Sequence, residues 1–292
     1  MAKILVVGLN PAWQHILSLP AIKTGEVNRA QESWSLASGK GLNAAKVLAR
    51  LGHEVSVLQI LAGENGRRCQ EACAKWKVRS LHVRTRGETR ECTTLLSGED
   101  HSATEFIEPF SAGPELAEQL LARVESNISY DAILFCGSAP RGIPDSIYGE
   151  ILKRINPAPI LWDSVVGLTP EVLKAVTWVK VNEKEFERLS VLTMSSWPKV
   201  LITSGAKPAR VLHSKNSGGS YALPALKEIK SPIGSGDTVT AVLVDGLLRG
   251  MDEEATVRRA LAAGMASCLT PLPAEYDPAE VSVFESRIRR EM

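Results

Sequence analysis

Six short runs of apolar residues, which alternate with longer segments of helical periodicity, constrain the fold of this chain more than any other feature. A run that is apolar at every position is buried on both faces, which is typical of a strand in a parallel sheet covered by helices on both sides. Alternation of such strands with helices predicts an open α/β fold. The six runs are Ile4–Val7, Ser56–Leu61, Ala132–Phe135, Ile160–Trp162, Trp178–Val181 and Val200–Thr203.

Two segments, about 11–37 and 83–109, depart from this rhythm because they are richer in threonine, serine and charged residues. The second contains a turn at 97–100, flanked by Arg90–Leu96 and Ser102–Ile107 as in a β-hairpin. We expect these segments to form a small antiparallel sheet that acts as a lid. The rest of residues 1–292 is expected to form a single α/β domain.

Composition excludes several classes of function. The chain has 34 basic and 33 acidic residues, so no bulk positive charge favours nucleic acid or an anionic membrane surface. No run approaches the roughly 18 apolar residues that a membrane helix needs. The first apolar run begins at Ile4, too early for a secretory signal, and the five cysteines form no CxxC pair. We therefore expect a cytoplasmic protein with no nucleic-acid or membrane partner.

The segment Gly234-Ser235-Gly236-Asp237 precedes a stretch of helical periodicity, so that a glycine turn leads into a helix. Such a turn directs several backbone N–H groups and the positive end of the helix dipole at one point. It is suited to bind a phosphate, or the charge that develops in phosphoryl transfer. An acid here could take a proton from an attacking hydroxyl, but it is also a common helix cap. The pattern alone leaves both roles open for Asp237.

A second glycine-rich segment, SGKGLNAA at 38–45, also leads into a helical pattern. Gly39, Gly41 and Ala44 match the spacing of the dinucleotide-binding fingerprint. That fingerprint should directly follow the first strand of a βαβ unit, whereas the first strand here ends much earlier, near Gly8. Nucleotide binding at this segment therefore remains one interpretation, and an ordinary turn and helix start is the other.

Polar residues follow the strand expected at Trp178–Val181. In open α/β sheets ligands bind beyond the carboxyl ends of the strands, where Asn182 and Glu185 would hold water and Mg²⁺ beside a triphosphate. A charged first turn on a solvated helix explains the same residues equally well. Arg90, in the second lid segment, is either a clamp for an anionic substrate or an ordinary surface arginine.

Taken together and in this order, the segments resemble the PfkB (ribokinase-like) carbohydrate kinase family over nearly the whole chain. They are most similar to its 1-phosphofructokinase and tagatose-6-phosphate kinase branch. The matching segments are GLNPA at 8–12, GEVNR at 25–29, SGKGLNAAKVL at 38–48, GETR at 87–90, GSAPRGIP at 137–144, VNEKE at 181–185 and GSGD at 234–237.

The resemblance implies a three-layer sandwich with a mostly parallel central sheet and a β-sheet lid. It also implies a kinase that uses ATP and Mg²⁺ to phosphorylate a hydroxyl of a phosphosugar, and that pairs through its lid as a homodimer. Asp237 would be the general base, and the N–H groups of Gly234, Ser235 and Gly236 would form the anion hole. The residues implied on the substrate side are Asn10, Gln14, Gly39, Lys40, Asn43, Arg90 and Ser138. Those implied on the cofactor side are Asn182, Glu185, Thr203, Gly205 and Ser267, with Glu185 as the metal ligand.

Several positions depart from the family pattern. Gln14 stands where the phosphosugar branch usually has an aspartate that grips sugar hydroxyls, and the bulky Trp13 precedes it. The segment 186–202 is shorter than usual, and Pro208 replaces a glycine near the expected nucleotide. These departures keep two alternatives open. One is a kinase of another sugar or small alcohol, and the other is a non-catalytic sugar-phosphate-binding relative with a degraded nucleotide site.

Overall fold

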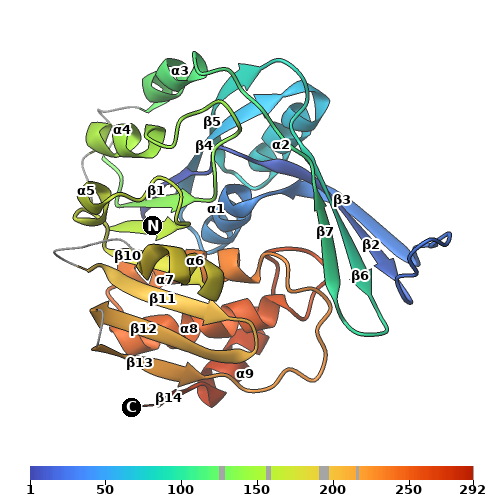
Figure 1. Cartoon of the computed structure of the whole chain (residues 1–292). Helices are drawn as coiled ribbons and strands as arrows, with labels where there is room; N and C mark the ends of the chain where they lie inside the picture. Colours follow the sequence, from blue (N-terminus) through green and yellow to red (C-terminus); the bar gives the residue numbers. More distant parts are fainter. Residues whose placement is uncertain (125–128, 156–158, 191–196, 215–216, 292) are drawn as a thin grey trace.

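The computed structural model describes residues 1–124, 129–155, 159–190, 197–214 and 217–291. In this part of the chain the strands form two separate sheets (Figure 1). The larger has ten strands in the order β14-β13-β12-β11-β10-β9-β8-β1-β4-β5, and the smaller has four in the order β3-β2-β6-β7. The mixed α/β class with a small accessory sheet, predicted from the sequence, is confirmed.

The six apolar runs all become strands of the large sheet. They lie next to one another and run parallel. A seventh parallel strand, β5 (Arg79–Thr85), pairs with β4. Each run is buried on both faces, as its composition predicts. The six strands are β1 (Lys3–Val7), β4 (Glu54–Ala62), β8 (Ala132–Cys136), β9 (Ile160–Asp163), β10 (Trp178–Asn182) and β11 (Lys199–Ser204).

Three strands that the sequence analysis did not predict extend the sheet in antiparallel fashion beyond β11. They are β12 (Lys207–Ser214), β13 (Ser217–Ala222) and β14 (Arg289–Glu291). Their sequences contain no continuous apolar run, because this edge of the sheet is largely open to solvent. Glycine and serine make up much of β13, and glycine is depleted in strands.

Helices cover both faces of the large sheet and enclose two separate cores. Alternate residues of β1 supply each core: Ile4 and Val6 face one, whereas Leu5 and Val7 face the other. The first core is closed by α1 (Lys40–Arg50), α2 (Gly63–Lys75), α7 (Ser235–Leu248), α8 (Glu253–Ser267) and α9 (Pro278–Arg287). The second is closed by α3 (Leu116–Arg123), α4 (Ile147–Arg154), α5 (Pro170–Leu173) and α6 (Glu183–Ser190).

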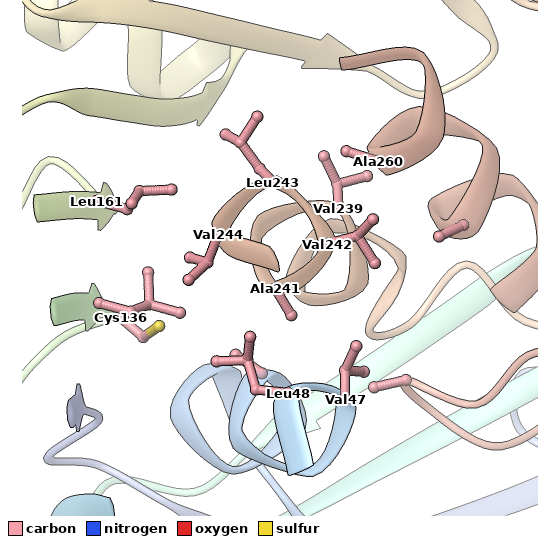
Figure 2. Packing of buried hydrophobic residues seen from close by; sticks show 14 of the residues in the cluster. Val47, Leu48, Cys136, Leu161, Val239, Ala241, Val242, Leu243, Val244 and Ala260 are labelled. Atoms are coloured by element: carbon pink, nitrogen blue, oxygen red, sulfur yellow. The ribbon is translucent and has the colours of Figure 1, made fainter. Parts of the chain in front are cut away.

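Helix α7 lies in the middle of the first core and is buried on nearly all sides. Figure 2 shows Val244 directed toward Cys136 and Leu161 of the sheet, and Ala241 directed toward α1. A helix that is buried all round is held by packing on every face. The packing therefore fixes the N-terminal end of α7, where the glycine turn lies.

The small sheet projects from the main body (Figure 1). Its central strands β2 (Ala12–Leu19) and β6 (Glu91–Ser97) pair in parallel, so the expectation of a purely antiparallel lid is wrong. The reason is that β2 and β6 come from different insertions. The hairpins of β2 with β3 (Glu32–Ser38) and of β6 with β7 (Ala103–Ile107) are antiparallel, as expected. The second insertion also begins later than 83, because Val83 pairs with Ile60 in the main sheet.

None of the helices in the described ranges is both long and apolar enough to cross a membrane.

Candidate active site

A first cavity, of about 490 Å³, lies beneath the lid. The carboxyl ends of β1, β8 and β10 and the N-terminal ends of α1 and α7 meet there, the usual place for a ligand in an open α/β sheet. It brings together most of the residues that the sequence analysis placed in a site: Asn10, Gln14, Gly39, Lys40, Asn43, Arg90, Ser138, Asn182, Gly234, Gly236 and Asp237.

Asp237 lies in the first turn of α7 and is 8% exposed. Its Oδ2 accepts a hydrogen bond of 2.7 Å from Nδ2 of Asn43 in α1. The N-cap position belongs to Gly234, and no side chain caps the helix there, so Asp237 is not the cap of α7. Burial, followed by the nearby Asp163 carboxylate, raises the pKa of Asp237 to about 6. Such a carboxylate is ionised at neutral pH yet basic enough to accept a proton.

The turn before Asp237 depends on Gly234, whose φ of 78° is in the left-handed region. A Cβ at Gly234 would lie 2.7 Å from the backbone nitrogen of Ala274. The Ser235 N–H donates to the Pro232 carbonyl at 3.3 Å. Among the described residues no backbone carbonyl accepts a hydrogen bond from the N–H of Gly234 or Gly236, so these two groups are free to bind an anion.

Behind Asp237 lies a buried charge cluster that the sequence analysis missed. Asp163, at the end of β9, is completely buried and accepts from Lys40 Nζ (3.0 Å) and Thr240 Oγ1 (2.7 Å). Lys180 Nζ lies 3.5 Å from the same carboxylate. A lysine and an aspartate within otherwise apolar strands were the available signal, since such residues are seldom buried without a partner.

These charges control one another's protonation. Burial by itself would raise the pKa of Asp163, but the Lys180 and Lys40 ammonium groups outweigh burial and hold that pKa below its usual value. Burial would likewise lower the pKa of Lys40, but the carboxylates of Asp163, Glu185 and Asp237 raise it instead. Lys40 is therefore a permanent positive charge at the wall of the first cavity.

The N-terminal end of α1 is positioned by a close backbone approach. A Cβ on Gly41 would lie 2.6 Å from Cα of Gly8, so only glycine at both positions lets α1 reach the end of β1. The strand that precedes α1 is β3, which belongs to the lid rather than to the large sheet. The dinucleotide-binding interpretation of Gly39, Gly41 and Ala44 is therefore not supported, because that fingerprint requires the first strand of the large sheet to lead directly into the helix.

Two lid-side residues have definite partners. The Arg90 guanidinium donates to the carbonyl oxygens of Asn10 (3.0 Å) and Pro11 (3.3 Å), which leaves other N–H groups for an anion. Gln14 is 3% exposed and donates through Nε2 to Thr94 Oγ1 at 2.7 Å. Gln14 thus lines the cavity, but its amide nitrogen is already bonded.

Asn182 and Glu185 form a reciprocal pair at the start of α6. The Glu185 N–H donates to Asn182 Oδ1, and the Asn182 N–H donates to Glu185 Oε2, both at 2.9 Å. The other carboxylate oxygen, Oε1, lies 3.4 Å from Lys40 Nζ, and Glu185 itself lines neither cavity. A single oriented carboxylate beside an anion site fits Mg²⁺, which binds through one or two carboxylates, water and substrate phosphates.

A second cavity, of about 310 Å³, adjoins the first across the glycine turn, and Pro232 and Gly236 line both. Its walls are mainly apolar and include Val239, Leu261 and Met265. Such walls suit a flat heterocycle. The implied residues Thr203, Gly205 and Ser235 line this cavity.

Two expectations about the second cavity need correction. Ser267 does not line it, because its hydroxyl turns inward to the Gly264 carbonyl at 2.8 Å, while the next residue, Cys268, does line it. Pro208 lies in β12 next to a register shift and outside the lining, so the cavity forms despite the proline. Of the shortened segment 186–202, residues 191–196 lie outside the described ranges.

Known proteins are similar to this chain over nearly its whole length. The family pattern of the pfkB family carbohydrate kinases matches residues 1–279. The 1-phosphofructokinase of Haemophilus influenzae is 28% identical over 283 residues, which cover 90% of each protein. A possible 1-phosphofructokinase from Thermotoga maritima superimposes with a TM-score of 0.83 at 18% identity, over 99% of each chain. Ribokinase from Arabidopsis thaliana, complexed with ribose and ATP, gives a TM-score of 0.70 at 20% identity, over 97% of this chain and 98% of that one. At these identities the two structures establish the fold.

Proposed function

This chain belongs to the pfkB family of carbohydrate kinases, and from that premise we propose that it transfers the γ-phosphoryl group of ATP to a hydroxyl of a phosphosugar, as a 1-phosphofructokinase does. One observation carries the proposal. Asp237, with its pKa raised to about 6, lies beside a glycine turn that separates a charged cavity from an apolar one. Phosphoryl transfer needs such an arrangement, because acceptor and nucleotide must meet at one anion site.

In this proposal the acceptor sugar occupies the first cavity, and its reactive hydroxyl lies against Asp237. Asp237 takes the hydroxyl proton while the oxygen forms a bond to the γ-phosphorus, and the bond to the bridging oxygen of ADP breaks. The N–H groups of Gly234 and Gly236 and the Lys180 ammonium stabilise charge on the transferring group. Asn43 holds the Asp237 carboxylate in place through its 2.7 Å hydrogen bond.

Different residues would bind the charged groups of the sugar and of the nucleotide. Arg90 and Lys40 would bind the phosphate already present on the sugar, as cationic groups at the cavity wall. Asn182 and Glu185 would hold Mg²⁺ on the nucleotide side, with Glu185 as the protein ligand. The metal, when bound, neutralises and orients phosphate oxygens. The second cavity, with Thr203 and Gly205 at its edge, would take the adenosine.

The test is ADP release with ATP and Mg²⁺ across fructose 1-phosphate, fructose 6-phosphate, tagatose 6-phosphate and unphosphorylated sugars. We expect turnover on a phosphosugar, and a fall of at least about 100-fold in kcat for Asp237→Asn with little change in sugar affinity. Unchanged turnover of that variant would remove Asp237 from the mechanism. Silence across the panel together with no ATP binding by calorimetry would favour a non-catalytic sugar-phosphate binder.

A second candidate function has a specific observation in its favour. Gln14 is neutral, buried and already bonded to Thr94, so it does not provide the carboxylate expected for a sugar hydroxyl. This favours a kinase of the same fold that acts on another sugar or small alcohol. Turnover confined to unphosphorylated members of the panel would support that candidate.

We also propose that two copies associate through their lids. The lid exposes Phe106 on β7 and Val27 between β2 and β3, at 58% and 77%. Association of two lids would remove these apolar side chains from water. Light scattering should give twice the mass of one chain, and Phe106→Ser should lower it. A parent protein of single-chain mass would contradict the proposal.

A further inference from the structure

Glu105 is a carboxylate in the first cavity for which the proposed reaction has no role. It belongs to lid strand β7, and it lines the cavity together with Gln14 and Asp237. Among the residues that line this cavity, Glu105 and Asp237 are the two acids. Asp237 lies at the N-terminal end of α7, on the side of the cavity away from the lid, whereas Glu105 lies on the lid itself. A ligand between them would be bounded by one carboxylate on each side.

The lid register places Glu105 on the face directed at the cavity. Glu105 pairs with Thr94 across β6 and β7, and Ile107 pairs with Cys92. Cys92 and Ile107 line the cavity, and residues two apart on a strand share a face. Phe106, which lies between them in sequence, is directed to the outer face. The orientation of Glu105 thus follows from the strand pairing.

Thr94 connects Glu105 to Gln14. It is the cross-strand partner of Glu105, and its hydroxyl accepts the 2.7 Å hydrogen bond from the amide nitrogen of Gln14. The two residues therefore lie on one face of three adjacent strands, β2, β6 and β7. Gln14 is neutral and its amide nitrogen is occupied, whereas Glu105 offers a charged acceptor on the same wall.

Glu105 is also free to bind a ligand. In the described ranges no hydrogen bond or ion pair within 4.0 Å holds its carboxylate, and the residue remains open to solvent. Desolvation at the cavity wall raises the pKa of Glu105, and the nearby Arg90 guanidinium offsets part of that rise. Arg90 itself is tied to the carbonyl oxygens of Asn10 and Pro11.

We propose that Glu105 determines specificity by accepting a hydrogen bond from a hydroxyl of the acceptor sugar, at the lid side of the cavity and away from the hydroxyl that reacts. The proposal rests on the function proposed above, since it needs a polyhydroxylated acceptor in the first cavity. A carboxylate selects a donor hydroxyl over a carbon that lacks one, because a ligand bound over Glu105 removes its water and an unpaired charge would then be left desolvated. Strand β7 of the lid supplies the charged acceptor that Gln14 on β2 does not.

The test compares Glu105→Gln with the matched control Glu108→Gln. Glu108 lies three residues further along the same segment, outside the cavity lining, and accepts from the Glu91 N–H at 3.0 Å. We expect Glu105→Gln to raise the KM of the phosphosugar by about 10- to 100-fold, the range of a lost charge-assisted hydrogen bond. The KM of ATP should stay within about twofold, and Glu105→Asp should restore part of the sugar affinity. Glu108→Gln should behave as the parent.

A deoxy analogue of the best substrate separates direct contact from an indirect effect. If Glu105 binds a hydroxyl, the parent should discriminate against the analogue that lacks it, and Glu105→Gln should lose most of that discrimination. An equal loss for the substrate and for every deoxy analogue would overturn the proposal, because Glu105 would then act through Arg90. Unchanged KM in Glu105→Gln would overturn it as well.

Sugar binding measured by calorimetry without ATP distinguishes this proposal from the proposed function. Binding that Glu105→Gln weakens, in a protein without turnover, would support Glu105 and contradict the kinase. Turnover that Asp237→Asn abolishes and Glu105→Gln leaves unchanged would support the kinase and contradict Glu105. Absence of both binding and turnover across the panel would overturn both. Equal unfolding midpoints for the two Gln variants would show that the lid is intact.

Discussion

Replacing Asp237 with asparagine is expected to stabilise the folded protein while it lowers kcat by at least about 100-fold. Burial beneath the lid, next to the Asp163 carboxylate, raises the pKa of Asp237 from 3.8 to about 6. Each tenfold weakening of an acid corresponds to about 1.4 kcal/mol, so keeping Asp237 ionised costs the folded state about 3 kcal/mol. Asparagine has the same size and no charge to desolvate. The variant is therefore expected to gain about 1–3 kcal/mol in free energy of unfolding at pH 8.

The gain in free energy of unfolding should increase with pH and should not decrease again. An acid with a raised pKa contributes stability that is fully present below its unfolded pKa and is lost as the pH rises through its folded pKa. For Asp237 that window extends from 3.8 to about 6. The stability difference between variant and parent should therefore be small near pH 4, grow between pH 4 and 6, and stay constant above.

Urea unfolding across this pH range measures the difference, and Asp163→Asn is the matched control. The Lys180 and Lys40 ammonium groups outweigh burial and hold the pKa of Asp163 below its usual value, so the sign is opposite. Asp163 contributes stability above its unfolded pKa, and Asp163→Asn should destabilise the protein at pH 8. In the parent, kcat should fall below about pH 6 as Asp237 becomes protonated. A less stable Asp237→Asn at pH 8, or a gain equal at pH 4 and 8, would refute this reasoning.

Three further variants test neighbouring parts of the site. Gly234→Ala should lose about 1–3 kcal/mol in urea unfolding, because φ is 78° and a Cβ would meet a backbone nitrogen at 2.7 Å; Gly250→Ala, with a φ of 67° and open space, should lose less. Lys180→Met removes a charge that lowers the pKa of Asp237, so the acid limb of the pH–rate profile should move above about pH 6, and an unmoved limb would contradict the coupling. Glu185→Gln should raise the Mg²⁺ concentration for half-maximal activity by at least about tenfold, and an unchanged Mg²⁺ titration would exclude Glu185 as ligand.

The sequence predicted the parallel half of the fold well, and the reason is physical. A strand covered by helices on both faces must be apolar throughout, so Ile4–Val7 and Val200–Thr203 stand out without any knowledge of their neighbours. Strands β12 and β13 carry no such pattern, since the antiparallel edge of the sheet is partly solvated. The parallel pairing of β2 with β6 was also out of reach, because it joins two insertions that are far apart in the chain.

Site residues were predictable where the backbone itself is constrained. Gly234 needs a left-handed φ, and Gly41 needs a close approach to Gly8, so both leave a glycine signature. The buried charges leave a weaker signal in the sequence. Asp163 and Lys180 lie in separate strands, and only the order β9-β10 in the sheet, together with α1 and α7 above it, makes them partners. Their effect on Asp237 is therefore a property of the folded cluster.

The same distinction explains how a departure at one position can be offset at another. Gln14 lacks the charge expected at its place in β2, and that position alone predicts a changed recognition of the sugar hydroxyls. In the folded lid, β6 lies between β2 and β7, and Thr94 bonds Gln14 while it pairs with Glu105. A carboxylate from a different insertion thus reaches the same wall of the cavity. Substrate recognition depends on the charges and donors gathered on that wall, whichever strand supplies them, and the assays on Glu105 measure it there.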